Sequence, residues 1–378
     1  MNVLIAADYR APSSGNFIAS VLELAERMRD AGNNTYFLFP DNGRGGYTWS
    51  KWLEENGFPV WLMDTSSSEE EIVAFLKKIV SENRIDLIHS HFGLCHRILL
   101  TRRKDLDNVQ VLIHDHMDFS PECNLHKQKL RTLMWSALYQ LKGIDIVSVM
   151  ERKHKSYLLT SKKHNWYVPN GLSLRRNVPR ELSREERRQQ MGIAENQKLC
   201  LFLGWDMYRK GVDIAVQAVA QLHQRDPSVH LGLVGFSDTP SEKCLQWIRE
   251  RTGVEPICSW IHFFPSTEDM FSYHRAADVY LSASRKEAFS YGILEAISQN
   301  TPVVVSNIEG TAWAMKYDKC LCYPVEDATS CANAIAAALL HTAKPSNNDV
   351  LLDQYGIDTW CRDIMTIYRS MCKRKTHY

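Results

Sequence analysis

The sequence predicts an α/β protein with two doubly wound parallel sheets, one in each half of the chain. Residues 3–7 form an apolar run, helically spaced apolar positions follow over 17–28, and a second apolar run lies at 36–39. The same strand–helix–strand alternation returns over 199–234, after a strongly polar stretch at 175–197. With 378 residues the chain is long enough for two domains. We expect the boundary between them in the polar stretch.

The expected domain limits follow from this polar stretch and from the pattern at the C-terminus. We place a first Rossmann-like domain at 1–178 and a second at 179–356. Residues 357–378 are expected to form a C-terminal helix, because apolar side chains recur at helical spacing between Trp360 and Met371.

Histidines stand at the carboxyl ends of two predicted strands in the first half. One strand ends with His89 and His91, and a later one ends with His114 and His116. Ligands bind at the carboxyl ends of strands in open α/β sheets, so four histidines there indicate a polar ligand site, although a single histidine is more often structural. A His-x-His pair also suggests zinc, but no cysteine or third histidine lies at a supporting spacing, so no metal is expected.

The loop after the first strand contains a single glycine, Gly15. A dinucleotide-binding fingerprint needs two further glycines at fixed offsets, and they are missing. A dinucleotide-dependent oxidoreductase is therefore disfavoured. Gly15 itself is compatible with a plain turn or with close approach of the backbone to a ligand at the strand end, and the sequence leaves both open.

The most informative stretch of the second half is 284–296. A buried strand precedes it at 278–281, and helical spacing begins at Phe289, which places Glu287 before a helix and Glu295 inside it. The N-terminus of a helix favours an anion such as phosphate. The two carboxylates could then accept hydrogen bonds from hydroxyls on either side of a diphosphate, or both could be ordinary solvated or structural side chains.

A second helix of this half is expected to begin close to Lys210. An apolar strand at 199–203 and Gly204 precede it, and apolar positions at helical spacing follow it. A lysine at a helix N-terminus can bind the same anion as the helix dipole. Lys210 is therefore a candidate phosphate ligand, and the alternative is a lysine exposed on the surface.

Composition excludes several classes of protein. The formal net charge is +1, which does not favour nucleic-acid binding. No apolar run reaches the length of a membrane span, and the first residues lack the features of a signal peptide. The 10 cysteines are scattered, as expected for reduced thiols in the cytoplasm. A cytoplasmic location is therefore expected.

Positive charge is concentrated in residues 97–180, which contain 16 lysines and arginines against 7 aspartates and glutamates. Within this segment, 125–141 interleaves basic residues with apolar ones such as Trp135. That composition is typical of an interfacial helix, which predicts peripheral contact with an anionic membrane at its inner face. An ordinary amphipathic helix packed on the sheet fits equally well.

Taken in order, these motifs resemble the retaining GT-B glycosyltransferases of family 4, also called glycosyl transferases group 1. The residues that carry the resemblance are the runs 86–91, 114–115, 168–171, 209–211, 234–235, 287–296 and 301–304. The resemblance implies a GT-B fold, in which two Rossmann-like domains face a central cleft and the C-terminal helix crosses back to the first domain. It also implies that neither a metal nor another cofactor is needed.

The resemblance assigns roles to particular residues. It makes His114, Glu287 and Lys210 catalytic, with Glu295 on the ribose hydroxyls and Glu287 on the donor sugar. The donor-binding residues it implies are Gly15, Arg209, Lys210, Glu287, Phe289, Ser290, Tyr291, Gly292 and Glu295. One position departs from the family pattern, because Trp205 stands where an arginine is usual. Either Arg209 or Arg285 is expected to compensate, or the diphosphate is held more loosely.

The expected function is a hexosyltransferase-type glycosyltransferase that moves a sugar, with retention, from a nucleoside-diphosphate sugar to a glycan or lipid-linked acceptor. The expected process is cell-surface polysaccharide synthesis. The sequence does not distinguish UDP from GDP. Two alternatives stay open, a non-catalytic nucleotide-sugar-binding protein and another GT-B enzyme such as an epimerase.

Overall fold

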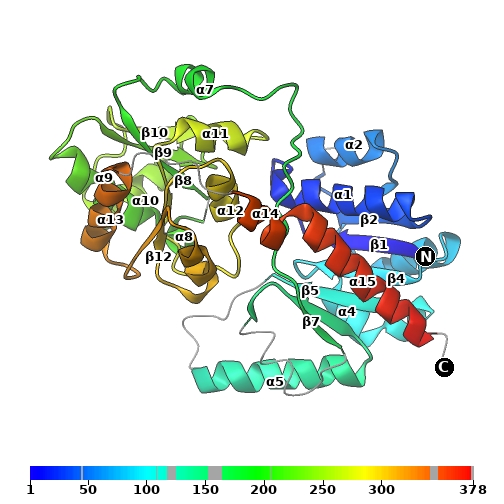
Figure 1. Ribbon diagram of the computed structural model, residues 1–378. Coiled ribbons are helices and arrows are strands. Elements are labelled where there is room, and N and C mark those ends of the chain that lie inside the picture. The colour runs from blue at the N-terminus through cyan, green and yellow to red at the C-terminus, as the bar shows by residue number, and fades with distance from the viewer. Residues whose placement is uncertain are drawn as a thin grey trace. The chain divides into compact units, whose positions relative to one another are not determined.

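The computed structural model describes residues 1–43, 46–107, 109–116, 125–151, 164–204, 206–340 and 348–375. The chain forms two compact units (Figure 1). Unit 1 consists of Met1–Arg175 together with Asp353–Tyr378, and unit 2 consists of Arg176–Leu352. The sequence placed the corresponding boundaries after 178 and after 356.

Unit 1 is built on a seven-stranded sheet in the order β3-β2-β1-β4-β5-β6-β7, with neighbouring strands parallel. The strand order reverses between β1 and β4, and the carboxyl ends of strands at such a reversal form a crevice for ligands. The strands are β1 (Asn2–Ala7), β2 (Asn34–Pro40), β3 (Val60–Met63), β4 (Leu87–His91), β5 (Gln110–Asp115), β6 (Asp145–Ser148) and β7 (Asn165–Tyr167).

Helices cover this sheet, and the C-terminal helix of the chain is one of them. Helix α15 packs along α1, as Figure 1 shows, and Trp360 of α15 lies against Gly171. The expected return of the terminal helix to the first unit is therefore present. The helices of unit 1 are α1 (Gly15–Asp30), α2 (Thr48–Glu55), α3 (Glu69–Glu82), α4 (His96–Thr101), η1 (Arg103–Leu106), α5 (Leu125–Leu141) and α15 (Ile357–Lys375).

Unit 2 repeats the architecture with a six-stranded parallel sheet in the order β10-β9-β8-β11-β12-β13. Here the strand order reverses between β8 and β11. The strands are β8 (Lys198–Leu203), β9 (Val229–Val234), β10 (Ile261–Phe264), β11 (Val279–Ser282), β12 (Val303–Ser306) and β13 (Cys320–Tyr323). The helices are α7 (Arg184–Met191), α8 (Met207–Lys210), α9 (Val212–His223), α10 (Glu242–Thr252), α11 (Met270–Ala276), α12 (Tyr291–Ser298), η2 (Glu309–Lys316), α13 (Ala328–Leu340) and α14 (Asn348–Tyr355), the last of which reaches into unit 1.

The central strands read as continuous apolar runs because both faces of each sheet are covered. All residues of β9, β11 and β12 are buried, and so are residues 3–7 of β1. Parallel sheets with helices on both faces require this pattern. The doubly wound α/β fold predicted from the sequence is confirmed in both units.

Gly211 fixes the geometry where α8 meets α9. Its φ is +75°, and a Cβ at this position would overlap the carbonyl oxygen of Ala283, in the loop that follows β11. Only glycine satisfies both conditions without strain. Gly211 therefore lets the segment after β8 lie directly against the segment after β11.

Replacing Gly211 by alanine should destabilise unit 2 strongly. Gly253→Ala is the matched control, because Gly253 also ends a helix with a positive φ, +69°, but has nothing within 4 Å of a built Cβ. We expect the control to lower the free energy of unfolding by about 1–2 kcal/mol through backbone strain alone. Gly211→Ala should cost roughly 1–3 kcal/mol more through overlap. Urea unfolding of both variants measures the difference, and equal costs would contradict this packing.

Candidate active site

Two residues predicted from the sequence meet at the strand reversal of unit 2. Lys210 is the last residue of α8, which follows β8, and Glu287 lies in the loop between β11 and α12. Lys210 Nζ donates to Glu287 Oε2 at 2.6 Å. Their side chains are 20% and 14% exposed, so water screens this ion pair less than it screens pairs on the surface. The pair lies at the place where doubly wound sheets bind ligands.

Glycines hold both partners in place. Gly204 has a φ of +143°, and a Cβ there would lie 2.7 Å from Cγ of Lys210. On the other side, a Cβ on Gly310 would overlap the carbonyl oxygen of Glu287. A backbone hydrogen bond of 2.8 Å from Arg285 to Arg209 joins the two loops directly. The backbone therefore fixes the spacing of Lys210 and Glu287 before any ligand binds.

Glu295 lies on the buried side of α12 and is itself part of an ion pair. It is 3% exposed. Arg176 donates to its Oε1 at 3.0 Å, and Nε2 of His274 lies 3.7 Å from its Oε2. The Arg176 guanidinium also lies 3.6 Å from the centre of the Phe271 ring. A carboxylate this deeply buried needs such compensation to stay ionised.

Sequence reasoning missed Arg176 and His274. Arg176 falls in the polar stretch that marks the boundary between units, where charged residues are usually solvated. His274 stands inside the short, almost fully buried helix α11, with no motif around it. Only the fold brings both side chains to Glu295.

The N-terminus of α12 presents backbone donors. Ser290 is its N-cap and makes no side-chain cap, so the first N–H groups of the helix have no partner within the helix. Gly292 lies so close to the Tyr280 hydroxyl that a side chain there would collide with it. The Phe289 ring is buried and stacks on Trp313 at 4.6 Å. At Phe289 and Gly292, therefore, only the backbone is suited to bind an anion; Tyr291 begins the helix beside them.

Both arginines that were expected to replace a missing arginine are engaged elsewhere. Arg285 donates to both carboxylate oxygens of Asp213 at 2.9 Å and to Glu326 at 2.7 Å. Arg209 donates to Asp206 at 2.9 Å. Because Asp213 is buried, removing Arg285 from it would leave an uncompensated charge. The geometry therefore speaks against compensation by Arg285, while Trp205 lies outside the described residues.

Gly15 lies at the strand reversal of unit 1. It is the first residue of α1, not part of the preceding loop as expected, and its φ is +53°. A Cβ there would lie 2.9 Å from the Tyr9 hydroxyl, which donates to the carbonyls of Ser13 and Ser14. The turn alone is thus sufficient reason for a glycine at this position.

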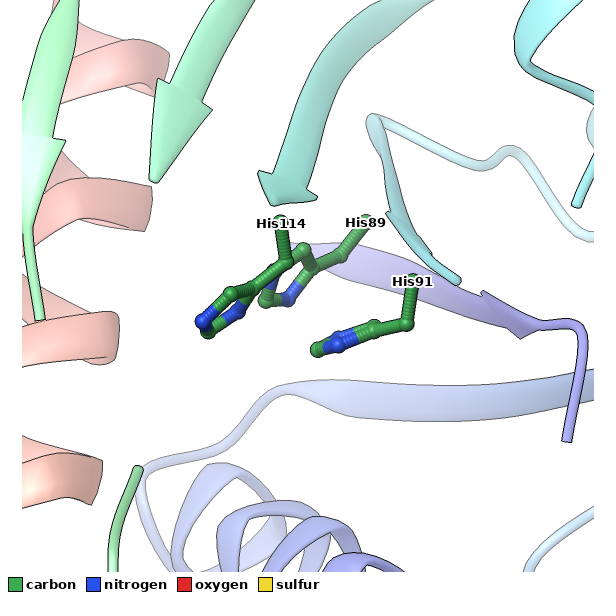
Figure 2. A group of neighbouring side chains, drawn as sticks. All are labelled: His89, His91 and His114. Atoms are coloured by element: carbon green, nitrogen blue, oxygen red, sulfur yellow. The ribbon is translucent and has the colours of Figure 1, made fainter. Parts of the chain in front are cut away.

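Three histidines of unit 1 gather in the C-terminal parts of β4 and β5, with their rings side by side (Figure 2). Each of His89, His91 and His114 is at most 1% exposed, and one ring nitrogen from each lies within 4.8 Å of the others. His91 and His114 are register partners in the two strands. The third histidine, which the sequence spacing did not reveal, is therefore supplied by the neighbouring strand.

Hydrogen bonds connect these rings. Nε2 of His89 lies 3.2 Å from Nδ1 of His114, and Nδ1 of His89 lies 2.6 Å from the Tyr368 hydroxyl on α15. Nδ1 of His91 lies 2.9 Å from Nε2 of His116. The His89 and His114 rings are within 14° of parallel. A shared proton explains the contact between His89 and His114 without a metal ion.

Burial keeps the cluster neutral. It lowers the pKa of His89 and of His116 to about 3, and it lowers the pKa of His91 and His114 well below the ordinary value of 6.5. The neighbouring imidazoles lower these pKa values further, because a second positive charge nearby would be repelled. At neutral pH each ring therefore carries one N–H donor and one acceptor nitrogen.

Comparison with known proteins identifies the second half of the chain. Residues 183–349 match the family described as Glycosyl transferases group 1. The chain is 36% identical over 130 residues to the lipopolysaccharide glucosyltransferase WaaG of Escherichia coli (strain K12). The matched stretch covers 34% of this chain and 33% of WaaG. The matched residues lie within unit 2, which therefore resembles this family. The resemblance inferred from the motifs is thus confirmed.

The chain also resembles proteins over more of its length. It is 26% identical over 272 residues to a D-inositol 3-phosphate glycosyltransferase of Corynebacterium urealyticum, covering 66% of this chain and 63% of that protein. The curated relatives are thus matched over about a third to 63% of their own length.

Solved structures match nearly all of the chain. A glycosyltransferase of Rickettsia africae has a TM-score of 0.77 at 16% identity and 98% coverage of both chains. Anabaena Alr3699/HepE in complex with UDP-glucose has a TM-score of 0.74 at 19% identity, covering 98% of this chain and all of that one. The expected GT-B fold is confirmed.

The neutral histidines predict that stability falls in mild acid. Once unfolded they bind protons below about pH 6.5, whereas in the fold they remain neutral to far lower pH. The unfolded state then binds more protons, so the free energy of unfolding decreases as the pH falls below 6.5. We expect a loss on the order of 1 kcal/mol per buried histidine between pH 7 and pH 5.5.

Urea unfolding across this pH range provides the test. The pKa values of Glu186 and Asp226 are lowered to about 2, so these two carboxylates take up protons in the fold only in stronger acid. His262→Gln in unit 2 is the control, because the pKa of His262 is also lowered, to about 4, by burial. This variant should reduce the pH-dependent loss of unfolding free energy only by the contribution of His262. A free energy of unfolding that does not change between pH 7 and pH 5.5 in the wild-type protein would contradict a neutral histidine cluster.

Proposed function

We propose that the protein is a retaining glycosyltransferase of family 4 that moves a sugar from a nucleoside-diphosphate sugar to a glycan or lipid-linked acceptor. The observation that carries the proposal is the Lys210–Glu287 pair at the strand reversal of unit 2, beside the N-terminus of α12. A cation, a carboxylate and the backbone N–H groups of a helix N-terminus are what a sugar diphosphate needs at one place.

The diphosphate is proposed to lie at the N-terminus of α12, next to Lys210. As the glycosidic bond breaks, the leaving nucleoside diphosphate gains negative charge. The Lys210 ammonium group and the helix N–H groups stabilise that charge, because they are fixed in place before the reaction begins. Glu287 then accepts hydrogen bonds from hydroxyls of the donor sugar, whose oxocarbenium-like state develops positive charge.

Glu295 is proposed to bind the ribose hydroxyls. Arg176 occupies Oε1 of this carboxylate from one direction, and a carboxylate has further lone pairs on both oxygens. Arg176 also compensates the charge of Glu295 in its buried position. The two glutamates thus serve opposite ends of the donor, and Arg176 supports one of them.

Unit 1 is proposed to supply His114 to the donor sugar and the binding surface for the acceptor. Nε2 of His114 is buried without a hydrogen-bond partner among the described residues. A ligand oxygen would satisfy this atom. Gly15, at the start of α1, is the other residue of unit 1 proposed to approach the donor.

The donor is proposed to be a nucleoside-diphosphate hexose. UDP-sugars are the first donors to test, because the similar protein HepE was solved with UDP-glucose; GDP-sugars are the second. No divalent cation or other cofactor is proposed to assist transfer, since Lys210 and the helix N-terminus provide positive charge. The proposed process is cell-surface polysaccharide synthesis in the cytoplasm, at the inner face of the membrane.

Substitutions should separate the roles of the two glutamates. Glutamine is preferred to alanine, because it preserves the packing around the buried side chain of Glu295. Glu295→Gln should weaken binding of the nucleoside diphosphate by about 1.5–3 kcal/mol, the usual value of a hydrogen bond to a charged group. Glu287→Gln should leave that affinity almost unchanged and sharply reduce turnover.

Calorimetric titration with UDP and GDP, beside turnover of the intact sugar donors in the presence of a chelator, measures both effects. Glu326→Gln is the control, since Glu326 is an exposed carboxylate of the same unit that pairs with Arg285. Equal loss of nucleotide affinity in the Glu287 and Glu295 variants would contradict the two-ended model. Nucleotide binding without any turnover in the wild-type protein would favour the non-catalytic alternative, and interconversion of the free donor would favour an epimerase.

Helix α5 is proposed to contact the membrane that holds the acceptor. It carries exposed apolar side chains, with Leu130 60%, Met134 65% and Leu141 84% exposed, and Trp135 stacks on Tyr139 at 5.8 Å. Lysines and arginines are frequent in the surrounding sequence, and the combination suits an anionic lipid surface. No helix among the described residues is long and apolar enough to cross a bilayer.

The double variant Met134→Glu, Leu141→Glu should lose binding to anionic vesicles, because two charges are placed on the apolar face. Leu340→Glu is the control, since Leu340 is 83% exposed in unit 2. Sedimentation with phosphatidylglycerol vesicles at low and high salt measures the effect. Absence of wild-type binding at low salt would remove the membrane part of the proposal.

A further inference from the structure

Tyr368 and His89 form a hydrogen-bonded chain that ends at His114. The chain runs from the Tyr368 hydroxyl to Nδ1 of His89 at 2.6 Å, and from Nε2 of His89 to Nδ1 of His114 at 3.2 Å. All three residues belong to unit 1, and none of them is more than 1% exposed. Each hydrogen bond contains one proton, so the direction of the first bond fixes the direction of the second.

The phenol decides that direction. Tyr368 is completely buried, and among the described residues His89 is its only hydrogen-bonding partner. Either direction leaves one buried donor unpaired: the phenol O–H if His89 donates, or Nε2–H of His114 if the phenol donates. A phenol is a stronger acid than a neutral imidazole N–H, and an imidazole nitrogen is a stronger base than a phenol oxygen, so the hydrogen bond in which the phenol donates is the stronger one. The Tyr368 hydroxyl is therefore the donor, and Nδ1 of His89 is the acceptor.

The rest of the chain follows from the chemistry of neutral imidazole, which has one donor and one acceptor nitrogen. His89 accepts at Nδ1 and so carries its proton on Nε2, which donates to Nδ1 of His114. His114 accepts at Nδ1 and so carries its own proton on Nε2. That nitrogen is buried and has no partner among the described residues, which marks it as the end of the chain that meets a ligand.

We propose that Tyr368, acting through His89, holds His114 in the Nε2–H tautomer, so that His114 is a hydrogen-bond donor to its ligand and not a base. Tyr368 and His89 are positioning residues in this arrangement. The inference rests on the proposed function only in identifying the ligand, an oxygen atom of the sugar donor. The tautomer itself follows from contacts within unit 1.

A neighbouring histidine provides an internal control. His91 is equally buried, and its Nε2 also lacks a partner, but its Nδ1 meets His116 at 2.9 Å and has no hydrogen bond to the Tyr368 chain among the described contacts. A change at Tyr368 should therefore alter His89 and His114 and leave the tautomer of His91 as it was. A general disturbance of the fold would affect all three.

The test is nitrogen NMR on full-length protein labelled with ¹⁵N-histidine, because protonated and bare ring nitrogens have well-separated chemical shifts. In the wild-type protein we expect the proton of His114 on Nε2. In Tyr368→Phe the proton of His114 can lie on Nε2 or on Nδ1, and both arrangements of the His89–His114 pair leave equal numbers of groups unpaired. Both should then be populated, so the chemical shifts of Nδ1 and Nε2 of His114 should move toward each other. Tyr36→Phe, which removes a hydroxyl from the same unit beside Trp61, should change neither.

Several results would overturn the inference. A wild-type proton on Nδ1 of His114 would reverse the chain, and unchanged His114 shifts in a folded Tyr368→Phe variant would remove Tyr368 from it. Stoichiometric zinc in protein purified without chelator, measured by plasma mass spectrometry and lost together with these shifts on chelation, would make the cluster a metal site. If Tyr368→Phe does not fold, the wild-type spectrum alone still decides the direction.

Turnover provides a second readout. If sugar transfer is observed, Tyr368→Phe should lower kcat by about three- to tenfold and leave KM for the donor nearly unchanged, since a weakened hydrogen bond in the transition state affects the rate. An unchanged kcat with the expected NMR shifts would show that the tautomer is fixed but not used. Absence of transfer by the wild-type protein would contradict the proposed function and leave the NMR result standing.

Discussion

The site in unit 2 depends on how closely the segments after β8 and β11 approach each other. β8 and β11 are neighbouring parallel strands, and Gly211 leaves no space for a side chain between the segments that follow them. Gly310, in η2, leaves none on the other side of Glu287. Lys210 and Glu287 meet only because their backbones are held in this way. A long lysine side chain loses considerable rotamer entropy when it is fixed, and here its stem is already confined against Gly204.

Electrostatic compensation differs between the two units. In unit 2 the buried or half-buried charges are matched locally, Lys210 by Glu287, Glu295 by Arg176 and Asp213 by Arg285. Removing one partner from such a pair costs more than the pair contributes, because the remaining charge stays desolvated. In unit 1 the cluster of His89, His91 and His114 avoids charge altogether. The candidate site of unit 2 is therefore charged, whereas the histidine cluster of unit 1 is neutral and polar.

The fold and part of the site could be predicted from the sequence, because their signals lie within short stretches of the chain. Apolar runs such as those of β1 and β8 and the helical spacing after Phe289 reveal their elements directly, because a parallel sheet needs continuous burial. Glu287 and Lys210 could be identified because each stands next to a strand end. The partners of Glu295 could not, since Arg176 is 119 residues away in the chain and its segment reads as a solvated boundary. His114 was predicted at a strand end, but its closeness to His89 and His91 was not, because that depends on the register of β4 with β5.

Helix α15 contributes a side chain to the histidine cluster of unit 1. Tyr368 comes from α15, far in sequence from β4 and β5, yet it supplies the only hydroxyl that hydrogen-bonds His89 among the described contacts. Its aromatic ring fills space in the core, as many residues would, but a phenylalanine would leave Nδ1 of His89 unpaired. A neutral imidazole cannot select its own tautomer when both nitrogens are buried, so an outside donor must do so. The return of α15 to unit 1 therefore contributes a hydrogen-bond donor as well as apolar contact. In the arrangement proposed here, that donor decides which ring nitrogen of His114 carries the proton.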